Sequence, residues 1–357
     1  MRVWAVLIAG ALWGRAAWAQ VEVSLQPWPD SARAAVSLTF DDAYPSQVSA
    51  AMPLLEARGF RGTFYLIVDR LFQRGKYQDL PSAPIGEWQA AFRRGHEMGS
   101  HTWTHVGLDT AGVERLQEEL RASKEALEAL FAGARVTSLA YPFSRADARV
   151  EREAAVYYTT GRLGPALPGA PPYNDPATAD LLGLLAFFLC TGETPQQWNE
   201  AVDQTRQGGG WLVEALHPLD EEGYCRVRQE DFAAHLDYLA RLKGQIWVAP
   251  VDQVAGRLLQ WRAASLQVED SSAERVRLRL REAGLYEWQV GVTIAGDWEV
   301  VDSGGHRLPA RAQEGGLRFP WPAGQEVVSL ERVGSTAVAG LTWGQVKGLF
   351  TPVDHDR

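Results

Sequence analysis

Apolar runs with strand character alternate with amphipathic helical segments between residues 35 and 261. About seven of these runs, among them residues 155–159 and 182–189, are short, bounded by turn residues and rich in β-branched and aromatic side chains, as buried strands are. Parallel strands need long crossover connections, usually helices, so this alternation is typical of consecutive βαβ units. Over about 230 residues it predicts an α/β fold, a TIM-like barrel with one unit short or missing.

Reactive side chains stand at four of the predicted strand ends. They are Asp41 and Asp42 after residues 35–40, His101 and His105 after residues 97–100, Tyr141-Pro142-Phe143 after residues 136–140, and Leu216-His217 at the end of residues 211–216. The carboxyl ends of parallel strands meet at one edge of the sheet, where such folds place their chemistry. We therefore expect these residues to lie close together.

The residue types at these ends suit metal-assisted hydrolysis. Two histidine nitrogens and one carboxylate oxygen make a three-ligand zinc site that leaves positions for water and substrate. Such a metal lowers the pKa of its water and polarises a carbonyl, as the hydrolysis of an amide or ester requires. A second carboxylate can take the proton from that water, and a further imidazole can protonate the leaving group.

The ordered set Thr39-Phe40-Asp41-Asp42, residues 100–105, a Pro-aromatic pair and Leu216-His217 resembles the polysaccharide deacetylase family. This family, carbohydrate esterase family 4, is built on the NodB homology domain, and the resemblance covers residues 34–261. It implies a distorted (β/α)7 barrel and metal-dependent deacetylation of sugars.

The resemblance also implies roles for individual positions. Asp42, His101 and His105 would bind one divalent metal ion, usually Zn²⁺. Asp41 would be the general base and His217 the general acid. The backbone N–H of Phe143 would be an oxyanion donor, and Leu216 would form a wall of the acetyl pocket.

The sequence departs from the family pattern at two places. Ala140 stands where members often have an Arg that pairs with the base, and Phe143 replaces the usual Tyr. We hypothesise that Arg145 or Arg162 supplies the missing charge. Asp175 is a candidate for the acidic residue that tunes His217, although an Asn-Asp-Pro sequence is also typical of a local turn.

From residue 264 the pattern changes to short strand candidates separated by turn signals. In residues 275–280, for example, Arg alternates strictly with Val and Leu. Such a series predicts a small, sandwich-like all-β domain. Its Trp288, Trp298, Trp321 and Trp343 suit either sugar stacking or core packing.

The N-terminus has the pattern of a signal peptide. Met1-Arg2 is positively charged, residues 3–12 are apolar, and Ala17-Trp18-Ala19 is a small-x-small cleavage site. The apolar stretch is shorter than the roughly 20 residues of a membrane span. We predict a signal peptide at 1–19, a catalytic domain at 20–262, a β-rich accessory domain and tail at 263–357, and no transmembrane segment in the mature chain.

Export to the periplasm or the cell exterior would place Cys190 and Cys225 where a disulfide can form, although the sequence does not show whether they meet. The formal net charge of −9 and the lack of basic runs exclude a general nucleic-acid binder.

The prediction is an exported, metal-dependent hydrolase that removes acetyl groups, N-acetyl before O-acetyl, from a carbohydrate. Candidate substrates are a chito-oligosaccharide, peptidoglycan or another N-acetylhexosamine glycan. The same site would serve an O-acetyl esterase or an amidase on a non-sugar substrate. In a different class, the alternative is a carbohydrate-binding protein with a decayed catalytic domain, which Ala140 favours and the intact acidic and histidine residues oppose.

Overall fold

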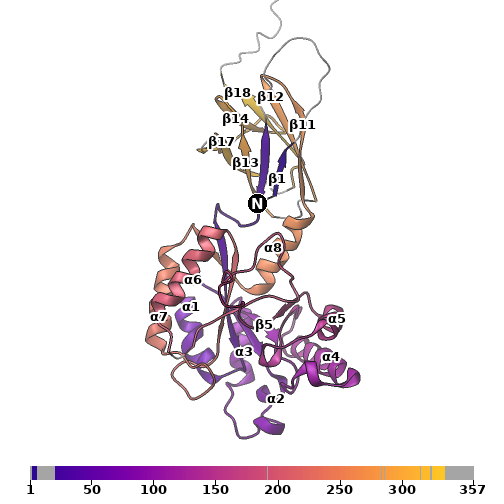
Figure 1. The fold of residues 1–357 in the computed structure, drawn as a ribbon, viewed down its shortest axis with the longest axis vertical. Coiled ribbons are helices and arrows are strands. Elements are labelled where there is room, and N and C mark those ends of the chain that lie inside the picture. Colours follow the sequence, from indigo (N-terminus) through magenta and orange to yellow (C-terminus); the bar gives the residue numbers. More distant parts are fainter. Residues whose placement is uncertain are drawn as a thin grey trace, which may run out of the picture. The chain divides into compact units, whose positions relative to one another are not determined.

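The computed structural model describes residues 2–5, 21–190, 192–282, 284, 286–313, 315–321 and 324–333 (Figure 1). Its contacts divide the chain into two compact units. Unit 1 runs from Gln26 to Ala263, and unit 2 combines the segment before Gln26 with the chain from Ala264 onward.

Unit 1 is built on a parallel sheet of eight strands. Seven lie in the order β7-β6-β5-β4-β3-β9-β8 and form an open half-barrel, and β10 also pairs with β3. The strands are β3 (Ala34–Asp41), β4 (Thr63–Leu66), β5 (Glu97–Ser100), β6 (Ser138–Ala140), β7 (Thr160–Arg162), β8 (Phe187–Phe188), β9 (Trp211–Leu216) and β10 (Ile246–Val248). This arrangement confirms the predicted α/β class and the distorted (β/α)7 barrel.

Helices connect these strands (Figure 1). They are η1 (Gln47–Ala51), α1 (Met52–Glu56), α2 (Val68–Leu71), η2 (Gly75–Tyr77), α3 (Ile85–Arg93), η3 (Leu108–Thr110), α4 (Val113–Leu130), η4 (Pro142–Ser144), α5 (Ala148–Tyr157), α6 (Pro195–Gly208), α7 (Gln229–Arg241) and α8 (Val251–Ala263). The sequence at the two ends of α6 explains where this helix begins and ends. Thr194 and Gln197 form a capping box at its start, and Gly209, at φ 75°, ends it in the left-handed conformation.

Two predicted strands of unit 1 differ from the structure. The strand expected at residues 155–159 is wrong, because α5 continues to Tyr157 with Val150 and Ala154 on its buried face, and β7 begins only at Thr160. The strand expected at residues 182–189 shortens to Phe187–Phe188.

Strand β3 places the candidate site, because it lies in the middle of the sheet. All eight of its residues are buried, with β9 on one side and β4 and β10 on the other. Asp41 ends the strand, and Leu216 at the end of β9 lies opposite Phe40. The edge of the sheet at which the carboxyl ends of the strands meet is therefore held in place by the fully buried strand β3.

Unit 2 contains two five-stranded sheets, in the orders β1-β2-β13-β17-β16 and β11-β12-β18-β14-β15, which confirms the predicted all-β region. The strands are β1 (Arg2–Ala5), β2 (Glu22–Gln26), β11 (Ser265–Ser271), β12 (Arg275–Arg281), β13 (Trp288–Thr293), β14 (Trp298–Asp302), β15 (Arg307–Leu308), β16 (Arg311–Gln313), β17 (Gly316–Trp321) and β18 (Val327–Arg332). Trp288 and Trp321 are fully buried cross-strand partners, so these two side chains pack in the core.

Strand β2 differs from the expected domain organisation. The sequence analysis placed these residues in the predicted catalytic domain at 20–262, whereas Glu22–Gln26 is a strand of the first sheet of unit 2. Val23 and Leu25 alternate inward along it, and Ser24 donates to the carbonyl of Gly291.

Residues 6–20 and 334–357 lie outside the described residues, and Trp343 lies among them. The predicted signal peptide falls largely in the first of these segments and stays a prediction. Within the described ranges, none of the helices has the length and apolar character needed to cross a membrane.

Candidate active site

Asp42, His101 and His105 come together directly beyond the ends of β3 and β5. Their potential ligand atoms all lie within 4.8 Å of one another. Oδ1 of Asp42 is 3.5 Å from Nε2 of His101 and 3.7 Å from Nε2 of His105. We call these three residues the metal triad.

The backbone of the metal triad is held in unusual conformations. Asp42 has φ 74° and His105 has φ 56°, in the left-handed region that non-glycine residues seldom occupy. Such strain persists only where the surrounding structure enforces it, and it gathers at functional sites. The conformation turns two side chains toward one point at the edge of the sheet.

The two triad histidines are set up to present Nε2. Nδ1 of His101 lies 2.7 Å from the carbonyl oxygen of Ala140, so Nδ1 carries the proton and donates it. A ligating histidine typically fixes its tautomer through such a bond. Burial, together with the neighbouring His101 and Lys76, lowers the pKa of His105 to about 2, so this imidazole is neutral at neutral pH.

Glu119 holds the loop that carries both histidines, and sequence reasoning missed it. Its fully buried carboxylate on α4 accepts hydrogen bonds from the backbone N–H of Trp103 at 2.9 Å and of Thr104 at 2.8 Å. The signal was an acidic residue on the apolar face of a helix, between Leu116 and Leu120. A buried carboxylate needs such partners, so this position indicated a contact to another segment.

Asp41 is a buried carboxylate with one engaged and one free oxygen. Oδ2 accepts a charge-assisted hydrogen bond from Nη2 of Arg162. Oδ1 is buried and has no hydrogen-bond partner among the described residues. Burial alone would raise the pKa of Asp41, but Arg162, His101 and His217 hold it below its usual value.

Arg162 decides between the two arginines that the sequence offered. It is 1% exposed and lies in β7 directly opposite Ala140 of β6 in the strand register. Arg145 instead lies 3.4 Å from Asp109 and is more than half exposed. The guanidinium missing at Ala140 is therefore present beside Asp41, supplied by the next strand.

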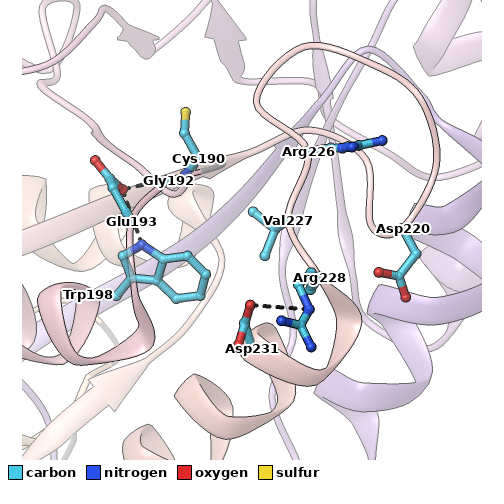
Figure 2. Close-up of a pocket in the computed structure, with 9 residues that line it drawn as sticks. All are labelled: Cys190, Gly192, Glu193, Trp198, Asp220, Arg226, Val227, Arg228 and Asp231. Atoms are coloured by element: carbon cyan, nitrogen blue, oxygen red, sulfur yellow. Dashed lines mark hydrogen bonds and ion pairs between the residues drawn. The ribbon is translucent and has the colours of Figure 1, made fainter.

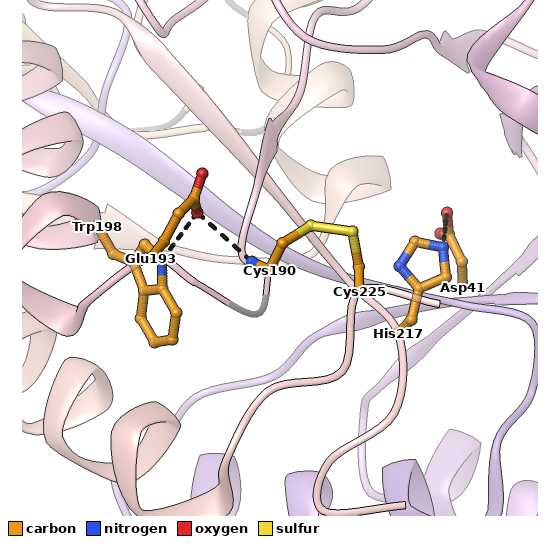
Figure 3. Close-up of a disulfide and its surroundings, with 6 residues drawn as sticks. All are labelled: Asp41, Cys190, Glu193, Trp198, His217 and Cys225. Atoms are coloured by element: carbon orange, nitrogen blue, oxygen red, sulfur yellow. Dashed lines mark hydrogen bonds and ion pairs between the residues drawn. A yellow bond between two sulfur atoms is a disulfide. The ribbon is translucent and has the colours of Figure 1, made fainter. Parts of the chain in front are cut away.

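His217 follows the end of β9, and its Nε2 lies 3.8 Å from Oδ2 of Asp41 (Figure 3). Burial lowers the pKa of His217, and the nearby Asp41 and Asp42 oppose this shift. Within the part of the chain that the structure describes, Nδ1 of His217 has no hydrogen-bond partner. Asp175 is not its partner, because this exposed carboxylate accepts from the N–H groups of Ala177 and Thr178 in a local turn.

Gln47 joins the two strand ends that carry Asp41 and His217, and it too was missed by sequence reasoning. Its Nε2 donates to the backbone carbonyls of both residues. Gln47 begins the π-helical turn η1, a rare conformation found frequently at functional sites. One buried amide thus fixes the separation of the two side chains.

Residues 29–160 match the family model described as polysaccharide deacetylase. Over these residues the chain matches the polysaccharide deacetylase family. The matched residues include Asp41, the metal triad and Phe143, and they end before Arg162 and His217. The sequence resemblance is thereby confirmed.

The chain also shows similarity to a curated protein and to solved structures. It is 32% identical over 281 residues to a gellan lyase of Bacillus sp., a match that spans 73% of this chain and only 11% of that relative. A candidate polysaccharide deacetylase of Mycobacterium smegmatis is 19% identical, with a TM-score of 0.49 and coverage of 65% of this chain and 92% of that one. The Xyl-CE4 domain of a xylanase from the hindgut metagenome of Trinervitermes trinervoides is 18% identical, with a TM-score of 0.42 and coverage of 62% and 89%.

Phe143 and Leu216 lie at the candidate site, and their predicted roles stay predictions. Phe143 follows Pro142 at φ 59°, and its exposed ring meets His105 edge-on with centroids 4.7 Å apart. Leu216 is fully buried and directly precedes His217 at the end of β9. Both positions border the residues expected to act on the acetyl group.

The donor set of the metal triad fits a divalent ion such as Zn²⁺. Two imidazole nitrogens and one carboxylate oxygen form a common zinc ligand set, and three protein ligands leave room for water or substrate. The hydrogen bond from His101 to Ala140 supplies the expected outer contact. Asp41, engaged by Arg162, lies beside the triad rather than within it.

Cys190 and Cys225 form a disulfide in unit 1, so the two cysteines, whose pairing the sequence left open, do meet (Figure 3). A pocket of about 350 Å³ lies beside it, lined in part by Glu193, Trp198 and Asp231 (Figure 2). Glu193 accepts a hydrogen bond from the indole N–H of Trp198 at 3.1 Å. This pocket holds none of the triad residues and neither Asp41 nor His217.

Proposed function

We propose that this protein is an exported hydrolase that uses a divalent metal, Zn²⁺ by preference, to remove acetyl groups from a carbohydrate. The observation that carries the proposal is the convergence of the metal triad, Asp41 and His217 at one sheet edge, with Arg162 paired to Asp41. N-acetyl groups on hexosamine glycans, such as chito-oligosaccharides or peptidoglycan, are the proposed substrates.

The side chains divide the acid–base work. Asp41 is ionised near neutral pH because Arg162 stabilises its charge, and Oδ1 is free to accept a proton from the attacking water. His217, whose Nε2 lies 3.8 Å from Oδ2 of Asp41, would donate a proton to the leaving nitrogen. The backbone N–H of Phe143 would donate a hydrogen bond to the oxyanion.

The metal triad completes this arrangement. When bound, a divalent ion at these residues supplies Lewis-acid polarisation and a lowered pKa for water. The chain itself orients the ligands: Ala140 fixes the tautomer of His101, and Glu119 fixes the loop that carries His101 and His105. This division of labour supports hydrolysis rather than passive glycan binding.

Export is part of the proposal. The N-terminal signal pattern supports it, and so does the disulfide between Cys190 and Cys225, because such bonds persist mainly in oxidising compartments.

The test is an acetate-release screen of metal-loaded protein, with Zn²⁺ or Co²⁺, on chito-oligosaccharides, peptidoglycan fragments and acetylated xylan. We expect acetate from at least one N-acetylated glycan and none from the Asp42→Ala variant. Release from acetylated xylan alone would replace the N-deacetylase with an O-acetyl esterase. A protein that binds no stoichiometric metal and releases no acetate would be a decayed, glycan-binding relative.

A further inference from the structure

Two exposed aromatic side chains flank the candidate site. Of the aromatic residues that the structure describes, only Phe143 and Tyr224 rank among the exposed large hydrophobic side chains, 57% and 67% exposed. The ring of Phe143 meets His105, and the ring of Tyr224 meets His217 edge-on with centroids 5.0 Å apart. Since the other described aromatic side chains are at least partly buried, this placement indicates a purpose other than packing.

Tyr224 lies in the loop between β9 and α7, and this loop is held firmly in three ways. Cys225, the next residue, is joined to Cys190 by the disulfide. The backbone pairs Val227 with Pro218 and Asp220 at 3.0 Å each. Gly223, the preceding residue, has room for no side chain, because a Cβ there would lie 2.7 Å from Pro218 and from the hydroxyl of Tyr44.

This fixation matters because an exposed aromatic ring binds best when it is already ordered. Loss of side-chain and loop freedom opposes binding, so a preorganised contact surface gains affinity. Figure 3 shows the disulfide with Cys190 toward Glu193 and Trp198, which line the pocket of Figure 2, and with Cys225 toward His217. The ring of Tyr224 is thus presented to solvent at a defined place beside the proposed general acid.

We propose that Tyr224 is a substrate-binding residue, a platform for the pyranose ring that bears the leaving nitrogen. The inference rests on the proposed function, because His217 must face the leaving group for Tyr224 to face its sugar. Pyranose rings have an apolar C–H face that an aromatic ring can cover while their hydroxyls stay in water. A substrate without a sugar ring gains nothing from this contact.

The disulfide serves the same purpose in this proposal. Without it, the loop at residues 220–227 keeps its backbone pairing but loses its covalent tie at Cys225. The ring of Tyr224 would then sample several positions, and glycan binding would weaken while hydrolysis of a small acetyl ester would not.

The test compares two substrate types on metal-loaded protein: the acetylated glycans of the screen, and ethyl acetate, which has neither a sugar ring nor an aromatic ring. For Tyr224→Ala we expect KM for the glycan to rise about fivefold, which corresponds to ~1 kcal/mol, the size of an aromatic pair contact. The value of kcat/KM for ethyl acetate should stay within about twofold of wild type. Tyr224→Phe should behave as wild type, because the ring face and not the hydroxyl makes the contact.

The controls separate this inference from the proposed function. Val156→Ala truncates a similarly exposed apolar side chain on α5, and it should change the kinetic constants for neither substrate. The Cys190→Ser/Cys225→Ser variant should reproduce the glycan-selective rise in KM while its near-ultraviolet circular dichroism stays native. Tyr224→Ala gives the same information if that variant does not fold.

Four outcomes overturn the inference. Equal losses on both substrates would make Tyr224 a support for His217, and an unchanged KM for the glycan would make it a bystander. Loss of activity in Tyr224→Phe would assign the effect to the hydroxyl. A wild-type protein that hydrolyses only ethyl acetate would refute the carbohydrate platform while leaving hydrolysis intact. One that is inactive on every substrate would refute the proposed function itself.

Discussion

Removing the Arg162 guanidinium should destabilise the protein strongly, because it would leave a buried carboxylate without its partner. Arg162 and Asp41 have side chains that are only 1% and 4% exposed, so neither charge is hydrated in the folded state. Arg162→Leu keeps an apolar side chain of moderate size in the space between Tyr65 and Phe188, whose rings lie 5.4 and 5.7 Å from the guanidinium carbon.

The expected loss is about 3–5 kcal/mol at neutral pH, the usual effect of deleting one partner of a buried ion pair. For a domain of this size it corresponds to a fall in Tm of about 10 °C. Arg145→Leu is the matched control, because Arg145 forms a 3.4 Å pair with Asp109 while 55% exposed. Such a surface pair contributes at most about 1 kcal/mol.

The dependence on pH follows from the lowered pKa of Asp41. The folded protein holds this carboxyl in its charged form more strongly than the unfolded chain does. The stabilisation is therefore complete above the unfolded-state pKa of about 3.9, and it is lost as pH falls through the lower folded-state pKa. The difference in stability between wild type and Arg162→Leu should narrow below about pH 4.

The assay is urea unfolding followed by intrinsic Trp fluorescence, in EDTA so that metal binding does not contribute to stability. Asp41→Asn introduced into Arg162→Leu removes the unpaired charge and should restore part of the loss, giving a coupling energy of about 2 kcal/mol in the double-mutant cycle. Equal stabilities of Arg162→Leu and Arg145→Leu, or additive effects in the cycle, would refute the pairing as the source of stability.

Three further outcomes follow from the geometry. Asp42→Ala should lose metal and activity together, whereas Asp41→Asn should retain metal by elemental analysis and lose turnover; an emptied site in Asp41→Asn would exchange their roles. Glu119→Gln should weaken Zn²⁺ binding by about 10–100-fold in a chelator competition, as substitutions of groups that orient metal ligands do, and unchanged affinity would show that Glu119 only packs. Deleting residues 264–357 alone should reduce solubility more than deleting them together with residues 1–25, because the first truncation leaves the edges of β2 without β13; equal solubility would contradict this reasoning.

Local patterns in the sequence were enough for the barrel and for the end of each chemistry-bearing strand. The apolar run predicted at residues 35–40 becomes β3, which extends one residue further at each end and so includes Asp41. The strand after α5 was misplaced because Ala154, Ala155 and Val156 suit a helix and a strand alike. Boundaries of this kind depend on packing, which a local pattern does not contain.

Contacts between distant segments explain what the sequence could not place. The alternation of Val21, Val23 and Leu25 was visible, but Ser24 meets Gly291 across 267 positions. The pairing of Cys190 with Cys225 depends in the same way on how the loop between β9 and α7 returns past β8.

Arg162 shows how a motif can lose a residue while the site keeps its charge. The proposed base, Asp41, is paired with the guanidinium of Arg162, and the register of β6 and β7 places Arg162 beside Ala140. The motif alone shows only that the arginine is missing at Ala140, which favours a decayed catalytic site. Since Arg162 is buried and paired with Asp41, Ala140 is no evidence for a decayed site, and the glycan-binding alternative must rest on measured metal content and acetate release instead.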